Sequence, residues 1–398
     1  MIINSLMDND YYSFTQKQVV LHQYSGAWVR SVFKWRNLDQ MNFRIPMEDF
    51  LGRLKKELDH LCTLRFRDAE LKYLSQISYF KRDFIEYLRL FQLNRAYIRC
   101  RIADNCLIVV IEGPWLATIL FEVPTLAIIS QLYTENTNTS KVIWLVEARK
   151  RLQEKFSFLE ASIHKDQIFR LAEFGTRRRA DVDWQDELIA TIKEKWGRFL
   201  VGTSNVMLAM KHGIKPIGTM SHQFVQAHQQ LGPRLIDSQS TALQSWANEY
   251  RGELGIALTD TLGFKAFLKD FDRYFALLFD GCRHDSGDPI WWVENLIAHY
   301  KNLRIDPRTK SAVFSDGLNF EIALDIFRRF HNDINVSFGI GTYLTNDCGF
   351  TAPQIVIKMV ECNGKPVAKI SDSIGKGMCE DPEFQEYLMK VVREKIAG

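Results

Sequence analysis

One repeated pattern constrains the fold of this chain more than any other. From about residue 140 onward, short apolar runs end in Gly, Thr, Ser, Asp or Arg, and most then lead into helical patterns. A strand followed by a helix, repeated this often, predicts parallel strands joined by right-handed crossovers. Seven such units favour a closed β/α barrel, with a doubly wound open sheet as the alternative. The run endings are 174–177, 201–205, 217–222, 257–260, 283–288, 314–317 and 338–342.

Both ends of the chain follow a different pattern. A helical repeat at 47–61 precedes an expected hairpin formed by 98–102 and 106–111. Near the other end, apolar runs flank Asn363-Gly364, a strong hairpin-turn signal, and Asp381-Pro382 begins a last helix. We expect this tail to pack with the N-terminal third. The predicted architecture is an α+β domain of residues 1–135 joined by 350–398, beside a barrel of residues 136–349.

The composition excludes several classes of protein. The 398 residues include 51 Lys and Arg and 48 Asp and Glu, so the net charge is only +3, which argues against binding to nucleic acid or an anionic membrane. Seven cysteines without a Cys-x-x-Cys pair fit a reducing cytoplasm. The apolar stretch 106–130 contains two Glu and two Pro, which predicts a core segment rather than a membrane span. The N-terminus lacks the pattern of a signal peptide. We therefore expect a cytoplasmic protein that handles small anions.

Three of the strand endings are candidate anion-binding loops. Residues 173–179 end in three arginines, whose guanidinium groups bind phosphate or carboxylate bidentately. Residues 202–205 offer hydroxyls and backbone N–H groups at an expected helix N-terminus, although an ordinary helix cap has the same pattern. Residues 339–342 form a Gly-x-Gly loop that lets backbone amides approach a phosphate. In a barrel these loops converge on one face, which predicts a shared anion site.

Two further strand endings carry reactive side chains. His222 precedes a helix and is a candidate nucleophile or acid/base, although a lone histidine is more often structural. Residues 283–288 contain an Arg, a His and two carboxylates, which are suited to bind ribose hydroxyls or Mg²⁺ or to stabilise a sugar cation. Two functions follow: phosphoribosyl transfer, or a glycoside-cleaving barrel with Asp285 and Asp288 as its carboxylate pair. The surplus of arginines and glycine loops over aromatic platforms favours phosphoribosyl transfer.

The chain resembles the bacterial nicotinate phosphoribosyltransferases along nearly its whole length. The resemblance implies the irregular β/α barrel of type II phosphoribosyltransferases. It also implies an ATP-assisted reaction of nicotinate with phosphoribosyl pyrophosphate, giving nicotinate mononucleotide and pyrophosphate for NAD salvage. It further implies ATP as co-substrate, Mg²⁺ held mainly through pyrophosphate, and a homodimer with its active site near the subunit interface. The matching segments are 10–12, 173–179, 202–205, 283–288, 314–316, 337–342 and 360–369.

The resemblance also implies roles for individual residues. His222 is the residue phosphorylated by ATP, Arg283 acts with Mg²⁺ on the leaving pyrophosphate, and Asp285 holds the ribose and faces its developing positive charge. The implied substrate-binding residues are Tyr12, Phe174, Arg177, Thr203, Ser204, Asp260, Asp288, Ser315, Asp316, Gly317, Gly339, Gly341 and Thr342.

The expected base pocket distinguishes two related enzymes. By the family pattern, the pyridine ring stacks on Phe174, with Tyr12 of a neighbouring subunit above it, and Arg177 meets the carboxylate or phosphate. The related nicotinamide enzyme carries an aspartate at the position matching Ser204. Because a carboxylate there repels nicotinate, Ser204 points to the acid as substrate. Nicotinamide phosphoribosyltransferase remains the alternative within this class.

Overall fold

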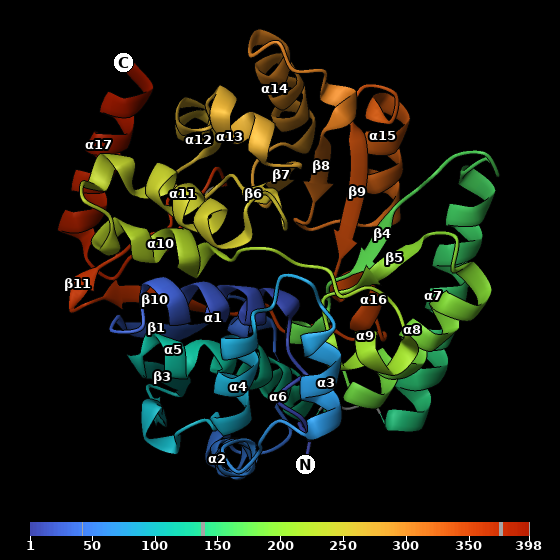
Figure 1. Ribbon diagram of the computed structural model, residues 1–398. Helices are drawn as coiled ribbons and strands as arrows, with labels where there is room; N and C mark the ends of the chain where they lie inside the picture. Colours follow the sequence, from blue (N-terminus) through green and yellow to red (C-terminus); the bar gives the residue numbers. More distant parts are fainter. Residues whose placement is uncertain (42, 137–139, 374–376, 398) are drawn as a thin grey trace.

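The computed structural model describes residues 1–41, 43–136, 140–373 and 377–397. These residues form an antiparallel sheet in the lower half of Figure 1 and a parallel sheet in its upper half. The antiparallel sheet has the strand order β11-β10-β1-β3-β2. Its strands are β1 (Trp28–Trp35), β2 (Ile98–Ala103), β3 (Cys106–Pro114), β10 (Ile355–Cys362) and β11 (Lys365–Pro366).

Segments far apart in the sequence share this antiparallel sheet, because β10 pairs with β1 along the whole length from Val29↔Cys362 to Trp35↔Ile355. Both predicted hairpins are confirmed. Between β10 and β11, Asn363 and Gly364 have φ values of 52° and 72°. This left-handed turn is the one that an Asn-Gly pair favours between antiparallel strands. The second hairpin joins β2 and β3.

The parallel sheet has the order β5-β4-β9-β8-β7-β6, and each strand pairs in parallel with its neighbours. Its edge strands β5 and β6 are bridged by the extended segment 216–219. Ile217 N donates to Thr203 O at 2.8 Å, and the Thr219 hydroxyl donates to Ile256 O at 3.0 Å. The strands are β4 (Leu171–Glu173), β5 (Leu200–Thr203), β6 (Ile256–Leu258), β7 (Gly281–His284), β8 (Ser311–Phe314) and β9 (Asn335–Ile340).

The predicted β/α barrel is therefore confirmed in an irregular form. Of the expected strands, the one ending at 217–222 is wrong, because the structure has an extended bridge there instead of a regular strand. Pro216 forms a parallel bridge with Thr203 but has no N–H to donate, so a regular ladder cannot run through it. The bridge then reaches β6 through the Thr219 side chain.

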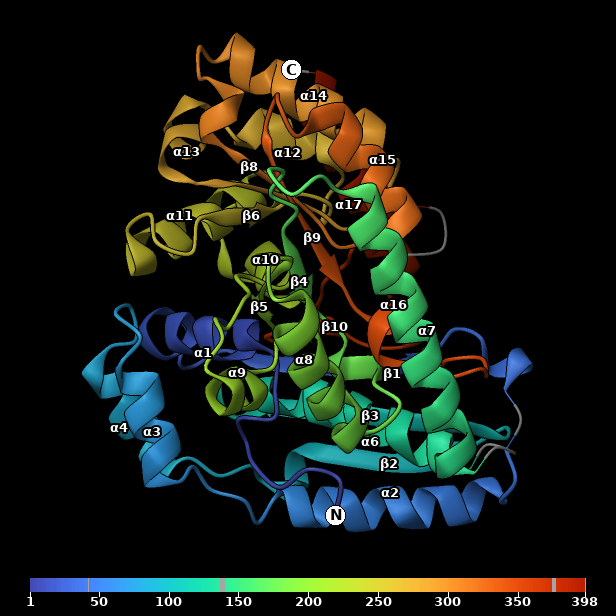
Figure 2. The ribbon, with the colours of Figure 1, turned by 90° about the vertical axis from the view of Figure 1, so that its right-hand side faces the viewer.

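Helices cover both sheets (Figures 1 and 2). The run Trp115–Glu135 is long and apolar enough to cross a membrane, but 83% of its apolar window is buried inside the fold, as expected for a core segment. Beside the antiparallel sheet lie α1 (Tyr11–Gln23), α2 (Met47–Leu61), α3 (Asp68–Ser75), α4 (Arg82–Leu90), α5 (Trp115–Thr118) and α6 (Glu122–Glu135). The later helices are α7 (Lys141–Ser162), α8 (Val182–Trp196), α9 (Val206–His212), α10 (His222–Leu231), α11 (Ser238–Tyr250), α12 (Phe264–Asp270), α13 (Arg273–Leu278), α14 (Pro289–Asn302), α15 (Phe320–Phe330), α16 (Thr342–Thr345) and α17 (Pro382–Ala397).

The last helix departs from the expectation that the tail packs with the N-terminal third. Asp381 caps α17 as predicted, accepting from Phe384 N at 2.9 Å. However, Leu388 and Val392 of α17 pack with Leu262 and Ala266, at the start of α12 beside the parallel sheet. The prediction was wrong for α17 because the chain crosses between the two sheets after β11. In Figure 1, α17 accordingly lies beside α12.

Candidate functional site

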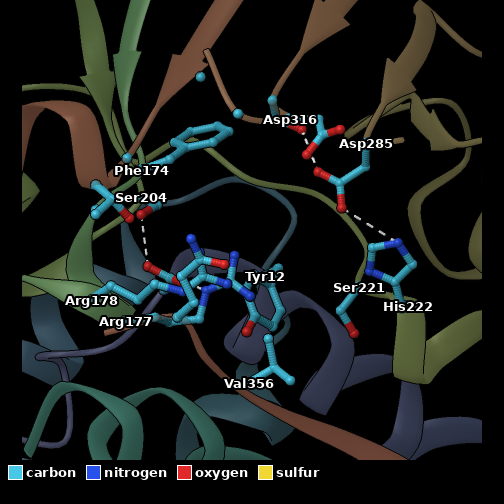
Figure 3. A pocket seen from close by; sticks show the side chains of 18 of the residues that line it. Tyr12, Phe174, Arg177, Arg178, Ser204, Ser221, His222, Asp285, Asp316 and Val356 are labelled. Carbon is cyan, nitrogen blue, oxygen red and sulfur yellow. Dashed lines mark hydrogen bonds and ion pairs between the residues drawn. The ribbon is translucent and has the colours of Figure 1, made fainter. Parts of the chain in front are cut away.

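A cavity of about 750 Å³ lies at the carboxyl ends of the parallel strands, facing the antiparallel sheet (Figure 3). The strand ends thus converge on one face, as expected for a barrel. The predicted site residues that line the cavity are Tyr12, Phe174, Arg177, Ser204, His222, Arg283, Asp285, Ser315, Asp316, Gly317, Gly339, Gly341 and Thr342.

His222 is held between two carboxylates at one side of the cavity. It is the first residue of α10, and its Nε2 lies 2.9 Å from Asp260 Oδ1 and 3.4 Å from Asp285 Oδ2. Burial and the nearby Lys369 lower the pKa of His222 to about 3, against the opposing pull of Asp260. The imidazole is therefore neutral near pH 7. A neutral imidazole has a nitrogen lone pair that can attack phosphorus.

Asp285 follows β7 and presents a negative charge to the same cavity. Its Oδ1 accepts a hydrogen bond from the Ser315 hydroxyl at 2.8 Å. Burial alone would raise the pKa of Asp285, but the positive charge of Arg283 helps to bring it below its usual value. An ionised carboxylate fixed in this way can stabilise positive charge that develops on a bound substrate.

The opposite side of the cavity contains an arginine flanked by acids. Arg177 Nε lies 3.3 Å from Asp10 Oδ2, and its NH1 lies 3.8 Å from Glu122 Oε1. The Ser204 hydroxyl donates to Asp10 at 2.6 Å. Burial raises the pKa of both Asp10 and Glu122, although Arg177 opposes this. Because burial disfavours the charged forms of these acids, the cost of bringing a further carboxylate to Arg177 is reduced.

Tyr12 enters this side of the cavity from the same chain. Its ring centroid lies 5.8 Å from Arg177 Cζ, and Figure 3 shows it near Arg177. The resemblance had implied a tyrosine from a neighbouring subunit at this place. Here α1 packs close enough to the barrel that the chain's own Tyr12 lies in the cavity wall.

The predicted glycine loop makes room for an aromatic ring. A Cβ atom at Gly339 would lie 2.3 Å from the Phe174 ring, and one at Gly341 would lie 2.8 Å from Phe174 O. Phe174 N also donates to Ile340 O at 2.9 Å. The two glycines therefore allow β4 and β9 to approach closely and set the position of the Phe174 ring.

Three predicted site residues do not line the cavity. Asp260 lies behind His222 and contacts it directly. The Thr203 hydroxyl is buried and donates to Glu173 Oε2 at 2.5 Å. Asp288 accepts from Trp291 N at 2.7 Å as the cap of α14. Thr203 and Asp288 thus make structural hydrogen bonds outside the cavity lining.

The three adjacent arginines have different environments. Arg177 and Arg178 line the cavity. The Arg179 side chain is fully buried and binds both oxygens of Asp8, each at 2.7 Å. Arg179 therefore holds the N-terminal segment against the barrel. Of the three arginines, Arg177 and Arg178 are the two placed to bind an anion in the cavity.

Two lysines that the sequence analysis missed also line the cavity. Lys358 lies on β10, where burial and the nearby Lys369 lower its pKa to about 7. The Lys369 Nζ lies 2.6 Å from Asp260 Oδ2. A signal was available for Lys358, since a lone lysine within the apolar run 355–360 is costly to bury unless it has a function.

His222, Asp260 and Asp285 place possible ligand atoms within 4.8 Å of one another. The set does not fit Mg²⁺, which prefers oxygen ligands and keeps several waters. Asp260 Oδ2 is already bound by the Lys369 ammonium and accepts from the Ser286 hydroxyl at 2.7 Å. A dication at this place would meet the ammonium charge, so these residues suit a histidine that reacts rather than a metal centre.

Comparison with known proteins identifies the family. The family model for the nicotinate phosphoribosyltransferase N-terminal domain matches residues 7–130, and the nicotinate phosphoribosyltransferase family model matches residues 169–395. Nicotinate phosphoribosyltransferase from Cupriavidus necator is 49% identical over 394 residues, which are 98% of each chain. The crystal structure of nicotinate phosphoribosyltransferase from Vibrio cholerae superposes with a TM-score of 0.92 at 37% identity, covering 99% of this chain and 94% of that one. The enzyme from Porphyromonas gingivalis gives a TM-score of 0.90 at 30% identity, covering 98% and 100%. This chain therefore belongs to the nicotinate phosphoribosyltransferase family.

Proposed function

We propose that this chain couples ATP hydrolysis at His222 to the transfer of a phosphoribosyl group from phosphoribosyl pyrophosphate to nicotinate. Transfer to nicotinate, which feeds NAD salvage, follows from the family. ATP coupling, Mg²⁺, a cytoplasmic location and a homodimer are our additions. The observation that carries the coupling is the neutral His222 held between Asp260 and Asp285 at the edge of the cavity.

The transfer step needs positioning and charge stabilisation rather than covalent catalysis by the protein. The bond between ribose C1 and the pyrophosphate oxygen breaks, and the pyridine nitrogen of nicotinate attacks C1 from the opposite face. Asp285 stabilises the positive charge on the ribosyl group, and Arg283 binds the departing pyrophosphate. When bound to the pyrophosphate, Mg²⁺ would add positive charge beside Arg283. Phe174 supports the pyridine ring, and Arg177 binds its carboxylate.

The coupling step uses the two nitrogens of His222 differently. Nε2 donates its proton to Asp260 Oδ1, while Nδ1 has no hydrogen-bond partner among the described residues. The Nδ1 lone pair attacks the γ-phosphorus of ATP, an N–P bond forms, and the bond from phosphorus to the β,γ-bridging oxygen breaks to release ADP. Water later cleaves the N–P bond and releases phosphate. Hydrolysis of this phosphohistidine drives synthesis forward.

One comparative assay tests the proposal. Pyrophosphate release is measured with nicotinate and with nicotinamide, each with and without ATP. We expect nicotinate to react at least about a hundredfold faster in kcat/KM, because specificity for a carboxylate depends on a buried charge, and we expect ATP to accelerate its reaction. Equal turnover of nicotinamide would contradict the substrate, and an absence of ATP stimulation would contradict the coupling.

The alternatives have less support from the site. A carboxylate-pair glycosidase would need Asp288 together with Asp285, but Asp288 caps α14 and lies outside the cavity lining. For nicotinamide, the pocket would need an acceptor for an amide N–H beside Ser204. Asp10 is present there, yet it is engaged by the Ser204 hydroxyl and by Arg177. The arginine therefore favours the acid.

The close contact between Gly339 and the Phe174 ring gives a prediction for Gly339→Ala. The added methyl overlaps the Phe174 ring, so the ring must move and the pyridine loses its support. We expect the KM for nicotinate to rise about tenfold, equivalent to about 1.4 kcal/mol, while the KM for phosphoribosyl pyrophosphate changes less than about twofold. Steady-state kinetics with each substrate varied in turn measure both.

Gly52→Ala is the matched control, because Gly52 lies in α2 with nothing within 4 Å of an added Cβ. It should leave both KM values unchanged. A selective rise in the KM for phosphoribosyl pyrophosphate in Gly339→Ala would show instead that the loop serves mainly a phosphate.

A further inference from the structure

Helix α10, which begins with His222, also binds the backbone of residues 359 and 368, in the C-terminal part of the chain. Gln229 of α10 bonds both backbone groups of Ala368, donating to Ala368 O at 2.7 Å and accepting from Ala368 N at 2.8 Å. On the same helix, Gln226 donates to Met359 O at 3.1 Å. A side-chain amide satisfied on both sides in this way fixes the backbone that it binds, because a shift of the strand would leave buried polar groups unpaired.

Lys369 follows directly after the residue held by Gln229. Its backbone exchanges hydrogen bonds with Met378, at 3.0 Å and 2.9 Å, so the segment is held on both sides. The Lys369 side chain is only 4% exposed, and its Nζ lies 2.6 Å from Asp260 Oδ2. The other oxygen of Asp260 binds His222 Nε2. The ammonium, the carboxylate and the imidazole therefore form a continuous buried chain.

We propose that Lys369 is a positioning residue for the phosphorylation of His222, and that Gln229 fixes its place. The inference rests on the proposed ATP coupling. Lys369 holds Asp260 ionised and oriented, so that Asp260 accepts the proton of Nε2 and leaves the lone pair on Nδ1 for ATP. The paired ammonium also opposes a second proton on the imidazole, because two like charges in a buried site repel.

The charges around His222 predict how loss of the ammonium will act. The charged groups that face His222 are Asp260 after β6, Asp285 after β7, Lys358 on β10 and Lys369 after β11. Arg283, on β7, is the positive charge beside Asp285. Loss of Lys369 removes the ammonium paired with Asp260, while Arg283 stays beside Asp285, so the balance at His222 shifts toward a protonated imidazole. A protonated imidazole has no lone pair and cannot attack ATP. The resulting defect should be largest at low pH and should shrink as the pH rises.

Lys369 also lines the cavity and is therefore within reach of a substrate phosphate. The two roles predict different kinetics. A lysine that binds ATP would mainly change the KM for ATP. A lysine that acts through Asp260 would change the maximal rate of phosphorylation and leave the KM nearly unchanged.

The test measures initial rates of ³²P transfer from γ-labelled ATP to the whole protein, across ATP concentrations, between about pH 6 and 8.5. For Lys369→Met we expect a maximal rate about thirtyfold below wild type at pH 6.5, closing to within about threefold at pH 8.5, with the KM for ATP within twofold. Lys369→Arg should recover to within about threefold of wild type, because it restores the charge. Gln229→Ala should lower the rate about fivefold with the same pH trend, because it frees the backbone beside Lys369.

Lys395→Met is the matched control, because it breaks another lysine–aspartate pair of the same tail, with Asp270 at 2.5 Å, outside the cavity lining. It should phosphorylate at the wild-type rate per folded molecule, as judged by circular dichroism. Wild-type rates in Lys369→Met, a loss confined to the KM for ATP, or a defect that does not vary with pH would each overturn this inference alone. An unlabelled wild-type enzyme would overturn the proposed coupling itself and this inference with it.

Discussion

The His222→Asn variant is expected to lose all transfer of the γ-phosphate of ATP to the protein, to below about a thousandth of the wild-type level, because the attacking nitrogen is removed. ATP should then no longer accelerate nicotinate mononucleotide synthesis. Some synthesis without ATP should remain, since Asp285 and Arg283 are still present for the transfer step. Asp260 keeps Lys369 and the Ser286 hydroxyl as partners, so the buried carboxylate is not left unpaired.

Acid-labile ³²P labelling and pyrophosphate release, each with and without ATP, measure the two effects of His222→Asn separately. His299→Asn serves as a control because this histidine lies on α14, outside the cavity lining, where it contacts Phe271 O. It should keep both activities. Persistent ATP stimulation in His222→Asn would rule out the phosphohistidine at this position.

For Asp285→Asn the expected loss is in the transfer step itself. The amide keeps the size of the side chain and can still bond the Ser315 hydroxyl, but it carries no charge to stabilise the ribosyl cation. Loss of such a preorganised charge lowers kcat by about a thousandfold. The measurement is made without ATP, so that the contact between Asp285 and His222 does not contribute.

Asp288→Asn provides the matched control for Asp285→Asn, three residues away in the same loop. Its side chain caps α14, and an asparagine oxygen can accept the same hydrogen bond from Trp291 N, so we expect almost no change in the free energy of unfolding and no effect on kcat. Equal losses of kcat in the two variants would contradict the separate roles of Asp285 in transfer and Asp288 in capping α14. Such a result would instead support the two aspartates as a catalytic carboxylate pair.

The fold was largely predictable because the carboxyl ends of the parallel strands can be recognised in the sequence. The strands β4, β5, β7, β8 and β9 each stop at or just before a Gly, Thr, Ser or charged residue, and each such ending faces the barrel mouth. The bridge 216–219 could not be told from a strand, because its failure to form a ladder depends on pairing across space. The place of α17 depends likewise on the path of the chain after β11, which leaves no local pattern.

The site was predictable to the extent that its residues stand at strand ends. Asp285 and Asp288 look alike in sequence, and only the direction of the backbone decides which carboxylate caps a helix and which faces the cavity. Lys358 lies on the antiparallel sheet and Lys369 on the segment that follows it, and both meet the barrel only in the folded molecule. Asp260, the partner of Lys369, lies about a hundred residues earlier in the chain, so local spacing could not reveal this pair.

The pairing of β10 with β1 also has a consequence during synthesis. Trp28 N donates to Asn363 Oδ1 at 2.9 Å across 335 positions of sequence. Strand β1 therefore cannot pair with β10 until β10 has been synthesised. At about 5 to 20 residues per second, the wait on the ribosome is roughly 20 to 70 s. During this time the three-stranded sheet β1–β3–β2 has an open edge of unpaired N–H and C=O groups on β1. At that edge a nascent chain is most exposed to mispairing with another copy, and a chaperone that covered it would prevent this mispairing.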